Sequence, residues 1–519
     1  MINENSTPNS AILPIGSDSK THNGLNSLPI VALLVICLAV LVFKLDAYPR
    51  IWFDEGYKLN AAYTVAHDGL YATYTTDGYV PFDPGTSGGP ADILPTALAI
   101  KLFGSTIVAA RLANVLYTLL AAISLYQIGC YLWGKLPALF CVLLVVAIPP
   151  ISQVGFITIG RQSLSEGTAF SLMVFGLWIL SHAWRTRSLS LSLMSGLMMG
   201  LGMLSKTQIA IGLVPALLAV AGWRWLRDRK GLSYLFAPAI MVMAVFLGWM
   251  VIGQLLTPFE IRQHNSALLM DAIKTNILTT LHGSNLDSQA LLVIAIMLLG
   301  MLTSAWRIWR AKTVGEEQWI ELTLVLFVLF MTIWFAVFSI GWVRYAYAGL
   351  IVGSFLIGRF IWDLLAKISA NKNEQMVGAV GIAVVAALSI NFYVISNGAV
   401  ANDAQNTAQY IATSIPKDAV IETWEWELDM LSGHRQFHHP QQALLFEAIR
   451  QSSHHQSFNL TYDALQANPD YLIVGQFGGW TGIYSDAMLQ KYFTPVANYG
   501  VYHIYKRISV SRIALTVTG

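Results

Sequence analysis

The stretch Leu28–Phe43, LPIVALLVICLAVLVF, is an apolar run without a charged side chain. A helix needs about 20 apolar residues to cross the roughly 30 Å hydrocarbon core of a bilayer, so this run predicts a membrane span. No basic segment begins it and no small-residue cleavage site follows it, which favours an uncleaved helix over a signal peptide. Residues 1–27 before it are rich in Asn, Ser, Pro and Gly and predict a disordered cytoplasmic tail.

The whole 519-residue chain has the composition of a membrane protein. Charged residues make up 12% of it, about half of the roughly 25% usual in soluble domains, and 55% of the residues are hydrophobic. The apolar runs predict a polytopic α-helical protein with about eleven spans and a range of ten to thirteen. They lie near 28–45, 95–128, 137–153, 166–182, 190–204, 207–223, 232–252, 288–305, 318–339, 345–364 and 376–396. The second run is too long for one span, so Ala91–Phe103 is expected to be a separate interfacial or short helix.

The distribution of Lys and Arg predicts the orientation. With the N-terminus inside, the short inner connections hold thirteen basic residues and the outer ones seven. Because basic loops stay on the cytoplasmic side, the expected protein is a multi-pass protein of the cell inner membrane. Residues 28–396 then form the membrane domain, with a first outer loop at 46–94, and residues 397–519 lie outside the membrane.

The segment 397–519 regains charged, His and turn residues. Gln409–Ile415 predicts a helix, whereas Ala419–Trp424, Tyr471–Val474 and Gly500–Tyr505 predict strands. This alternation favours a small extracytoplasmic α/β domain.

Two function classes are disfavoured by composition. The formal net charge of +2 offers no concentrated basic face for nucleic acid. The three cysteines, Cys37, Cys130 and Cys141, lie in apolar runs and provide neither a disulfide framework nor a CxxC metal pair.

The first outer loop begins with the stretch IWFDEGYKLN at residues 51–60. Asp54 and Glu55 would stand in the first turn of a helix at the headgroup level, where the helix dipole favours carboxylates, so a capping pair is one interpretation. Neighbouring residues of a helix point about 100° apart, so one carboxylate could instead face a substrate while the other holds a cation or a donor group. Tyr57, Tyr79 and Asp83 fit a sugar-binding or acceptor-binding loop, although the same composition also occurs in ordinary turns.

A second group of ionisable residues lies at the outer ends of other spans. Arg161 and Glu166 enter an apolar helix, which is costly unless they pair or carry a function. Lys206 and Arg344 are lone cations that could also snorkel to the interface. A lipid-linked phosphate would use such cations, with Tyr345 beside Arg344, and a hydroxyl awaiting deprotonation would use the acids.

At these residues the chain resembles the lipid-carrier-dependent GT-C glycosyltransferases, the group of protein O-mannosyltransferases and lipid A aminoarabinose transferases. The resemblance covers most of residues 28–507. It is carried by Asp54-Glu55, by 98–104 with 109–112, by 160–166, 202–207 and 344–345, and by 416–421 and 469–474 of the tail. The acid at 166 departs from the pattern, since it is commonly Asp in the family and is Glu here.

The resemblance implies an inverting transfer of a monosaccharide from a polyprenyl-phosphate-linked donor to a lipid, glycan or protein acceptor. Asp54 would be the general base, and Glu55 and Glu166 would assist at the catalytic site. Arg161, Arg344 and Lys206 would bind the donor phosphate, where developing negative charge is stabilised. The aminoarabinose-transferase branch also holds zinc, for which Asp83 and His264 occupy comparable regions, although two ligands alone do not make a zinc site.

Two other interpretations compete with this one. A lipid or sugar transporter would need ionisable residues near mid-membrane and related halves with broken helices. A receptor or scaffold for the tail domain would leave the acids Asp54, Glu55 and Glu166 without a purpose. The paired histidines His438-His439 and His454-His455 are expected to be exposed residues of the tail domain rather than metal ligands.

Overall fold

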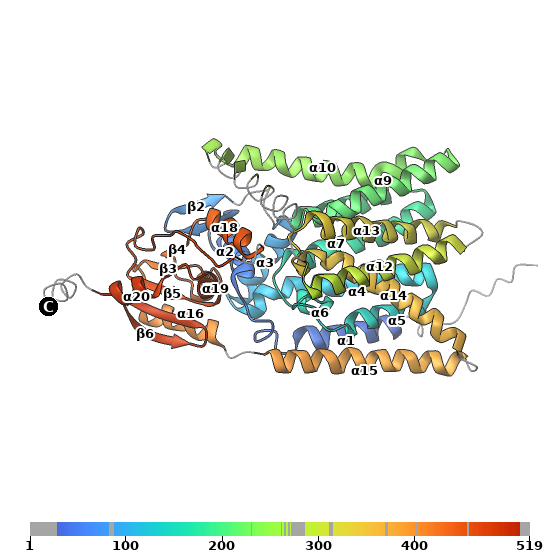
Figure 1. Cartoon of the computed structure of the whole chain (residues 1–519). Coiled ribbons are helices and arrows are strands. Elements are labelled where there is room, and N and C mark those ends of the chain that lie inside the picture. Colours follow the sequence, from blue (N-terminus) through green and yellow to red (C-terminus); the bar gives the residue numbers. More distant parts are fainter. Residues whose placement is uncertain are drawn as a thin grey trace, which may run out of the picture.

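The computed structural model describes residues 28–81, 88–229, 231–260, 286–310, 315–368, 372–399, 402–453 and 456–508, with isolated positions within 262–274. A bundle of long helices occupies one end of the elongated molecule and a smaller mixed domain occupies the other (Figure 1). Helices α2 and α3 lie between the two parts.

Eight helices of the described chain are long and apolar enough to cross a membrane. They are α4 (Ile107–Trp133), α7 (Ser165–Thr186), α9 (Ile209–Asp228), α10 (Leu232–Leu256), α12 (Ser288–Arg310), α13 (Glu316–Phe338), α14 (Tyr347–Ile368) and α15 (Lys372–Gly398). Three shorter apolar helices accompany them: α1 (Leu28–Val42), α5 (Lys135–Ala147) and α8 (Leu189–Ser205). The multi-pass helical architecture is thus confirmed, while the count of about eleven spans stays a prediction.

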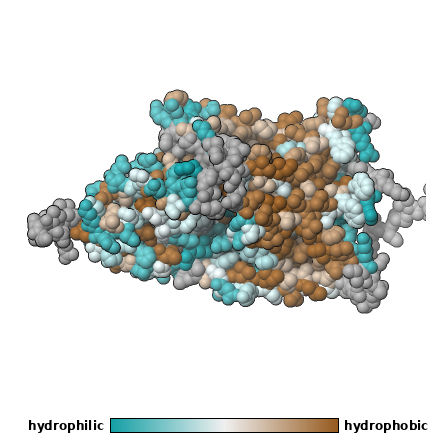
Figure 2. Space-filling model, viewed as in Figure 1, coloured by the Kyte–Doolittle hydropathy of each residue, from teal (hydrophilic) through white to brown (hydrophobic). Residues whose placement is uncertain are grey.

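The outward faces of the bundle are apolar. Large side chains such as Ile240 and Leu247 on α10, and Ile382 and Val385 on α15, are exposed. Figure 2 shows this hydrophobic surface over the helices, with hydrophilic side chains on the mixed domain and at the far helix ends. An apolar surface of this extent is what contact with lipid requires.

The long apolar run around 95–128 is divided, as expected, into two helices. Helix α3 (Pro90–Phe103) ends before Gly104, whose φ of +84° suits glycine. Helix α4 then starts at Ile107, capped by the Thr106 side chain, which accepts a hydrogen bond from the Ala109 amide. Within its described residues before α3, the first outer loop contains α2 (Phe53–Asp68) and a hairpin of β1 (Ala72–Thr75) and β2 (Gly78–Pro81).

The C-terminal domain is built on a five-stranded sheet with the order β4-β3-β5-β7-β6. Strand β3 (Ile421–Thr423) pairs in parallel with β4 (Phe437–His438) and β5 (Tyr471–Val474), whereas β7 (Tyr502–Arg507) is antiparallel to β5 and β6 (Phe493–Tyr499). The helices are α16 (Asp403–Ser414), α17 (Glu427–Ser432), α18 (Gln442–Ser453), α19 (Gln476–Thr481) and α20 (Asp486–Tyr492). The expected small α/β domain is confirmed, and β4 and β6 were not predicted.

Helix α2 joins the two parts of the molecule. Its Asn60 side chain donates to Asp429 of α17 at 2.6 Å and exchanges hydrogen bonds with the Tyr74 backbone of β1. The Thr76 amide donates to the Phe437 carbonyl at 2.9 Å. The first outer loop and the C-terminal domain therefore share one polar and packed interface.

We predict that Gly56→Ala loosens this interface. A Cβ at Gly56 would lie 2.5 Å from the Trp426 carbonyl carbon, closer than side-chain atoms pack. Overpacking of this kind costs about 1–3 kcal/mol, so the purified protein should melt at a lower temperature. Gly248→Ala in α10 is the matched control, because a Cβ there meets no atom within 4 Å; equal melting of the two variants would contradict the prediction.

His438 and His439 were expected to be exposed, but the structure shows one half-buried and the other buried. His439 is buried, stacks on Trp426 at 3.7 Å, and places Nε2 3.0 Å from Asp429 Oδ2. His438 is half-buried and its Nδ1 lies 2.5 Å from Glu422 Oε2. Their acid partners, Asp429 of α17 and Glu422 of β3, are ten and sixteen residues away in the sequence, so the residues next to the histidines do not reveal them. His454-His455 lie outside the described residues.

The hydrogen bond to Glu422 raises the pKa of His438 above its ordinary value. In the unfolded chain a histidine has a pKa of about 6.5. Because the pKa of His438 is higher in the folded protein, its pair with Glu422 stabilises the domain fully below about pH 6.5. This stabilisation is lost as the pH rises through the folded-state pKa. We therefore expect the difference in melting temperature between the wild type and His438→Gln to shrink as the pH increases. A constant difference from about pH 5 to 9 would contradict this.

Candidate active site between the helices and the C-terminal domain

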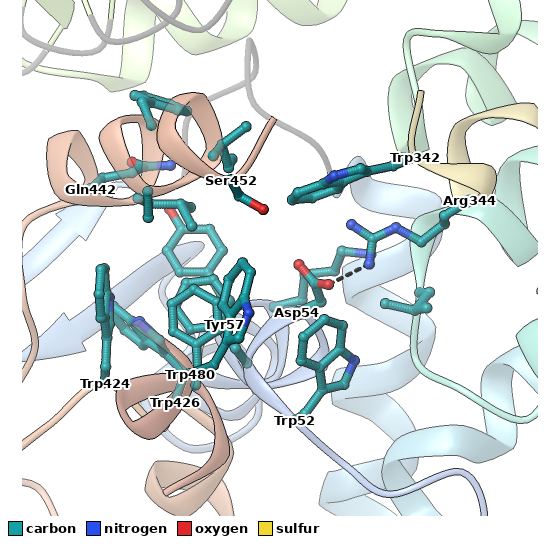
Figure 3. A pocket seen from close by; sticks show the side chains of 18 of the residues that line it. Trp52, Asp54, Tyr57, Trp342, Arg344, Trp424, Trp426, Gln442, Ser452 and Trp480 are labelled. Carbon is teal, nitrogen blue, oxygen red and sulfur yellow. Dashed lines mark hydrogen bonds and ion pairs between the residues drawn. The ribbon is translucent and has the colours of Figure 1, made fainter. Parts of the chain in front are cut away.

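A cavity of about 590 Å³ lies between one end of the helical bundle and the C-terminal domain. Its charged residues all come from the helical part, whereas the C-terminal domain contributes mainly aromatic and aliphatic side chains (Figure 3). The lining comprises Trp52, Phe53, Asp54, Tyr57, Lys58, Leu164, Glu166, Lys206, Trp342, Arg344, Tyr345, Trp424, Trp426, Pro440, Gln442, Leu445, Phe446, Ala448, Ile449, Ser452, Gln476, Phe477 and Trp480.

Asp54 stands in the first turn of α2 and points into this cavity (Figure 3). Its carboxylate forms an ion pair with Arg344, which belongs to the short helix η1 (Val343–Ala346) before α14. The indoles of Trp52 and Trp342 lie on either side of Asp54 in the close-up view. The Asp54 side chain is 26% exposed and lines the cavity, so a molecule there can reach it.

Arg344 connects Asp54 to a second carboxylate. Its Nε lies 3.2 Å from Glu166 Oε1 at the start of α7, and Lys206 Nζ lies 3.0 Å from the same oxygen. Lys206 directly follows α8, and its ammonium lies over the Tyr345 ring at 5.6 Å from the centroid. The structure thus brings together five of the residues predicted from four separate turns.

Glu55 does not belong to the cavity. It is fully buried, accepts two hydrogen bonds from Arg111 at 2.6 and 3.0 Å, and accepts a third from the Ser163 amide at 2.7 Å. The expectation that Glu55 takes part in catalysis is therefore corrected: the turn of about 100° between neighbours sends Asp54 to the cavity and Glu55 into the helix bundle.

Arg161 is also placed differently from the prediction of phosphate binding. Its guanidinium is fully buried and donates to backbone carbonyls of the last turn of α1 and of the segment that follows it, including those of Leu41, Phe43, Lys44 and Tyr48. The last carbonyls of a helix have no partner within the helix, and Arg161 supplies donors to those of Val40 and Leu41. Arg161 closes the C-terminal end of α1, so it is not available to a donor phosphate in the cavity.

The other predicted site residues lie in the cavity, elsewhere in the structure, or outside the described residues. Tyr57 lines the cavity and meets Trp426 edge to face at 5.1 Å. Tyr79 of β2 is 45% exposed, packs against Tyr74, and does not line this cavity, so its sugar contact stays a prediction. Asp83 and His264 lie outside the described residues, and within the described part of the chain no three His, Cys, Asp or Glu residues form a metal-binding group.

Several lining residues were not predicted. Lys58 lies one helical turn after Asp54, a spacing of four that could have pointed to it. Trp424, Trp426 and Trp480 come from the tail, where the sequence carries no sign that they approach Asp54. Only the docking of the C-terminal domain brings them to the cavity.

A buried acid holds this aromatic wall in place. Glu425, between Trp424 and Trp426, accepts hydrogen bonds from the amides of Phe477 and Gly478 at the start of α19. Burial raises the pKa of Glu425, while these amide donors oppose the shift. The carboxylate thereby orients α19, which presents Phe477 and Trp480 to the cavity.

The chain is similar to a protein-family sequence model and to several solved structures. Residues 92–249 match the sequence model of the dolichyl-phosphate-mannose-protein mannosyltransferases. No curated protein sequence matches the chain. Among solved structures, ArnT from Cupriavidus metallidurans bound to undecaprenyl phosphate is 13% identical with a TM-score of 0.63, over 94% of this chain and 99% of that one.

A second similar structure is the oligosaccharyltransferase AglB from Archaeoglobus fulgidus in complex with an inhibitory peptide and a dolichol-phosphate. It is 13% identical with a TM-score of 0.55, over 94% of this chain and 75% of that one. At these identities the likeness concerns the fold. The helical bundle, the intervening outer loop and the small C-terminal domain together are the fold of the GT-C glycosyltransferases.

Proposed function

We propose that this protein is an inverting glycosyltransferase that moves a monosaccharide from a polyprenyl-phosphate-linked donor to an acceptor hydroxyl at the outer face of the membrane. The observation that carries the proposal is the position of Asp54: an accessible carboxylate in a cavity that also holds cations, at the junction of apolar helices and a polar domain. The resemblance of the cavity-bearing fold to ArnT, whose structure contains undecaprenyl phosphate, supports a lipid-linked donor.

Asp54 is the base of the proposed reaction. The acceptor oxygen attacks the anomeric carbon while its proton passes to the Asp54 carboxylate, and the electrons of the breaking carbon–oxygen bond remain on the phosphate. Attack opposite the leaving group inverts the configuration. A base must lie within hydrogen-bond reach of the acceptor hydroxyl, which the cavity permits at Asp54.

Arg344 and Lys206 are the proposed partners of the leaving phosphate. In the structure their charges are engaged by Asp54 and Glu166, so the cations are already held in place before a ligand enters. As negative charge develops on the phosphate oxygen, fixed cations stabilise the transition state more than the ground state. Transfer of Arg344 from Asp54 to the phosphate would also release the carboxylate to act as base. In this scheme Glu166 positions both cations.

The acceptor would enter along the aromatic wall. Tyr57, Trp426 and Trp480 offer ring faces, and Gln442 and Ser452 offer hydrogen-bonding groups. Pockets of this type, apolar with few polar groups, orient a ligand while keeping water out. The acceptor is thus proposed to be a hydroxyl-bearing lipid, glycan or protein group that reaches Asp54 from the C-terminal domain.

The proposed location is the cell inner membrane, with the N-terminus inside and the C-terminal domain outside. A divalent metal at Asp83 and His264 stays a prediction, and no step above depends on it. A transporter is the competing proposal. In the structure Asp54, Glu166 and Arg344 lie at or near helix ends, in a cavity beside the C-terminal domain, which favours transferase chemistry over transport.

The test is a transfer assay with the purified full-length protein. Radiolabelled polyprenyl-phosphate sugars and a membrane extract as the source of acceptors should yield labelled product and free polyprenyl phosphate with the wild type. Movement of intact donor across sealed vesicles without any cleavage would instead support the transporter.

A further inference from the structure

The residues lining the cavity include more cations than carboxylates. Within the described lining, two carboxylates, Asp54 and Glu166, face three cations, Lys58, Lys206 and Arg344, so the formal charge is +1. Arg344 contacts both carboxylates and Lys206 contacts Glu166. Lys58 is the cation for which the cavity itself provides no paired acid.

Lys58 lies on the same face of α2 as Asp54, four residues further on. Its side chain is nearly buried, with 7% of the residue exposed, yet it contributes to the cavity surface. A buried ammonium needs a counter-charge. Among the described residues this is Asp92 of α3, whose Oδ2 lies 3.3 Å from Lys58 Nζ, at the long end of hydrogen-bond distances.

Asp92 is held by other groups as well. Ser165 donates to its Oδ2 at 2.7 Å and Thr168 donates to its Oδ1 at 3.1 Å, both from α7. Asp92 is 2% exposed and is absent from the cavity lining. Since an ammonium has three N–H donors, Lys58 can keep its contact with Asp92 and still offer donors to an anion in the cavity.

We infer that Lys58 is a further binding residue for the donor phosphate, because Lys58 lines the cavity while its acid partner Asp92 does not. This inference rests on the proposed function. Lys58 would contact a phosphate oxygen one helical turn from the base, on the same helix. The helix thereby fixes the spacing between the proton acceptor and the phosphate cation.

The reaction leaves the total charge of the site unchanged. The bond from the anomeric carbon to the phosphate oxygen breaks, and a bond from that carbon to the acceptor oxygen forms. The acceptor proton neutralises Asp54 while the phosphate, now a monoester, gains one negative charge. The negative charge therefore moves from Asp54 toward the phosphate, and a cation beside both stabilises this movement.

The alternative is that Lys58 only neutralises Asp92. Lys58→Gln alone does not separate the two roles, because it leaves a buried carboxylate unpaired and the protein could fail to fold. The double variant Lys58→Gln with Asp92→Asn removes both charges and leaves neutral amides that can still hydrogen-bond Ser165 and Thr168. Asp92→Asn alone is the matched control, since it removes the acid and keeps the cation.

The experiment measures binding of a polyprenyl phosphate, and of the uncharged polyprenol of equal length, to the purified full-length variants. Loss of a charge-assisted hydrogen bond predicts about 10- to 100-fold weaker binding of the phosphate by the double variant. Binding of the polyprenol should be unchanged, and Asp92→Asn should bind the phosphate at least as tightly as the wild type.

Wild-type affinity in the double variant would overturn the inference, as would an equal loss for phosphate and polyprenol. A wild-type protein that does not prefer the phosphate over the polyprenol would instead contradict the proposed function. The two failures are therefore distinguishable.

Discussion

Asp54→Asn should abolish sugar transfer while the protein still folds and still binds a polyprenyl phosphate. The amide keeps the shape of the side chain but cannot take a proton from the acceptor. Loss of a general base lowers the rate by about 10²- to 10⁴-fold. Because the amide also releases Arg344 from its ion pair, the variant should bind the polyprenyl phosphate more tightly than the wild type.

The measurement combines a transfer assay with a lipid-binding assay on the same preparation. Asp77→Asn is the control, since Asp77 is an exposed acid in the turn of the same outer loop and should transfer at the wild-type rate. Normal transfer by Asp54→Asn would move the base to another residue, with Glu166 as the next carboxylate of the cavity.

Arg344→Gln is expected to have the second-largest effect. Arg344 contacts both cavity carboxylates, so its removal takes away a cation for the leaving phosphate and leaves Asp54 and Glu166 without a shared partner. Removal of one preorganised donor to developing negative charge costs about 10²- to 10³-fold in rate. Arg344→Lys should recover part of the activity, because lysine restores the charge but not the two-pronged contact.

Arg435→Gln provides the matched control for Arg344. It removes an ion pair of similar exposure, Arg435 with Asp68 at 2.6 Å, from the interface between α2 and the C-terminal domain outside the cavity lining. Its transfer rate should stay near that of the wild type. Equal rates for Arg344→Gln and the wild type in single turnovers would exclude the proposed role of Arg344 in the chemical step.

The cavity explains why some of the predicted site residues could be expected to lie together. Asp54, Glu166, Lys206 and Arg344 are polar residues at the ends of apolar runs, and such residues are costly unless they pair or work together. That cost is a property of the sequence, so their gathering could be expected. Tyr345 follows Arg344 directly and accompanies it into the cavity.

The errors have a common physical origin. Glu55 and Arg161 meet the same sequence criteria as Asp54 and Arg344, yet each is buried against partners distant in the chain, Arg111 and the carbonyls after α1. A sequence records that an ionisable group stands at a helix end. It does not record whether that group faces a cavity or a neighbouring helix.

The sequence by itself determined that the chain is a multi-pass helical membrane protein with a small mixed domain at its end, because a bilayer requires long apolar helices and the tail lacks them. Tertiary structure alone decided which ionisable residues share the cavity. The orientation of α2 about its own axis places Asp54 in the cavity and Glu55 in the helix bundle. The docked C-terminal domain supplies Trp426 and Trp480. Both depend on packing between segments hundreds of residues apart, which local patterns do not encode.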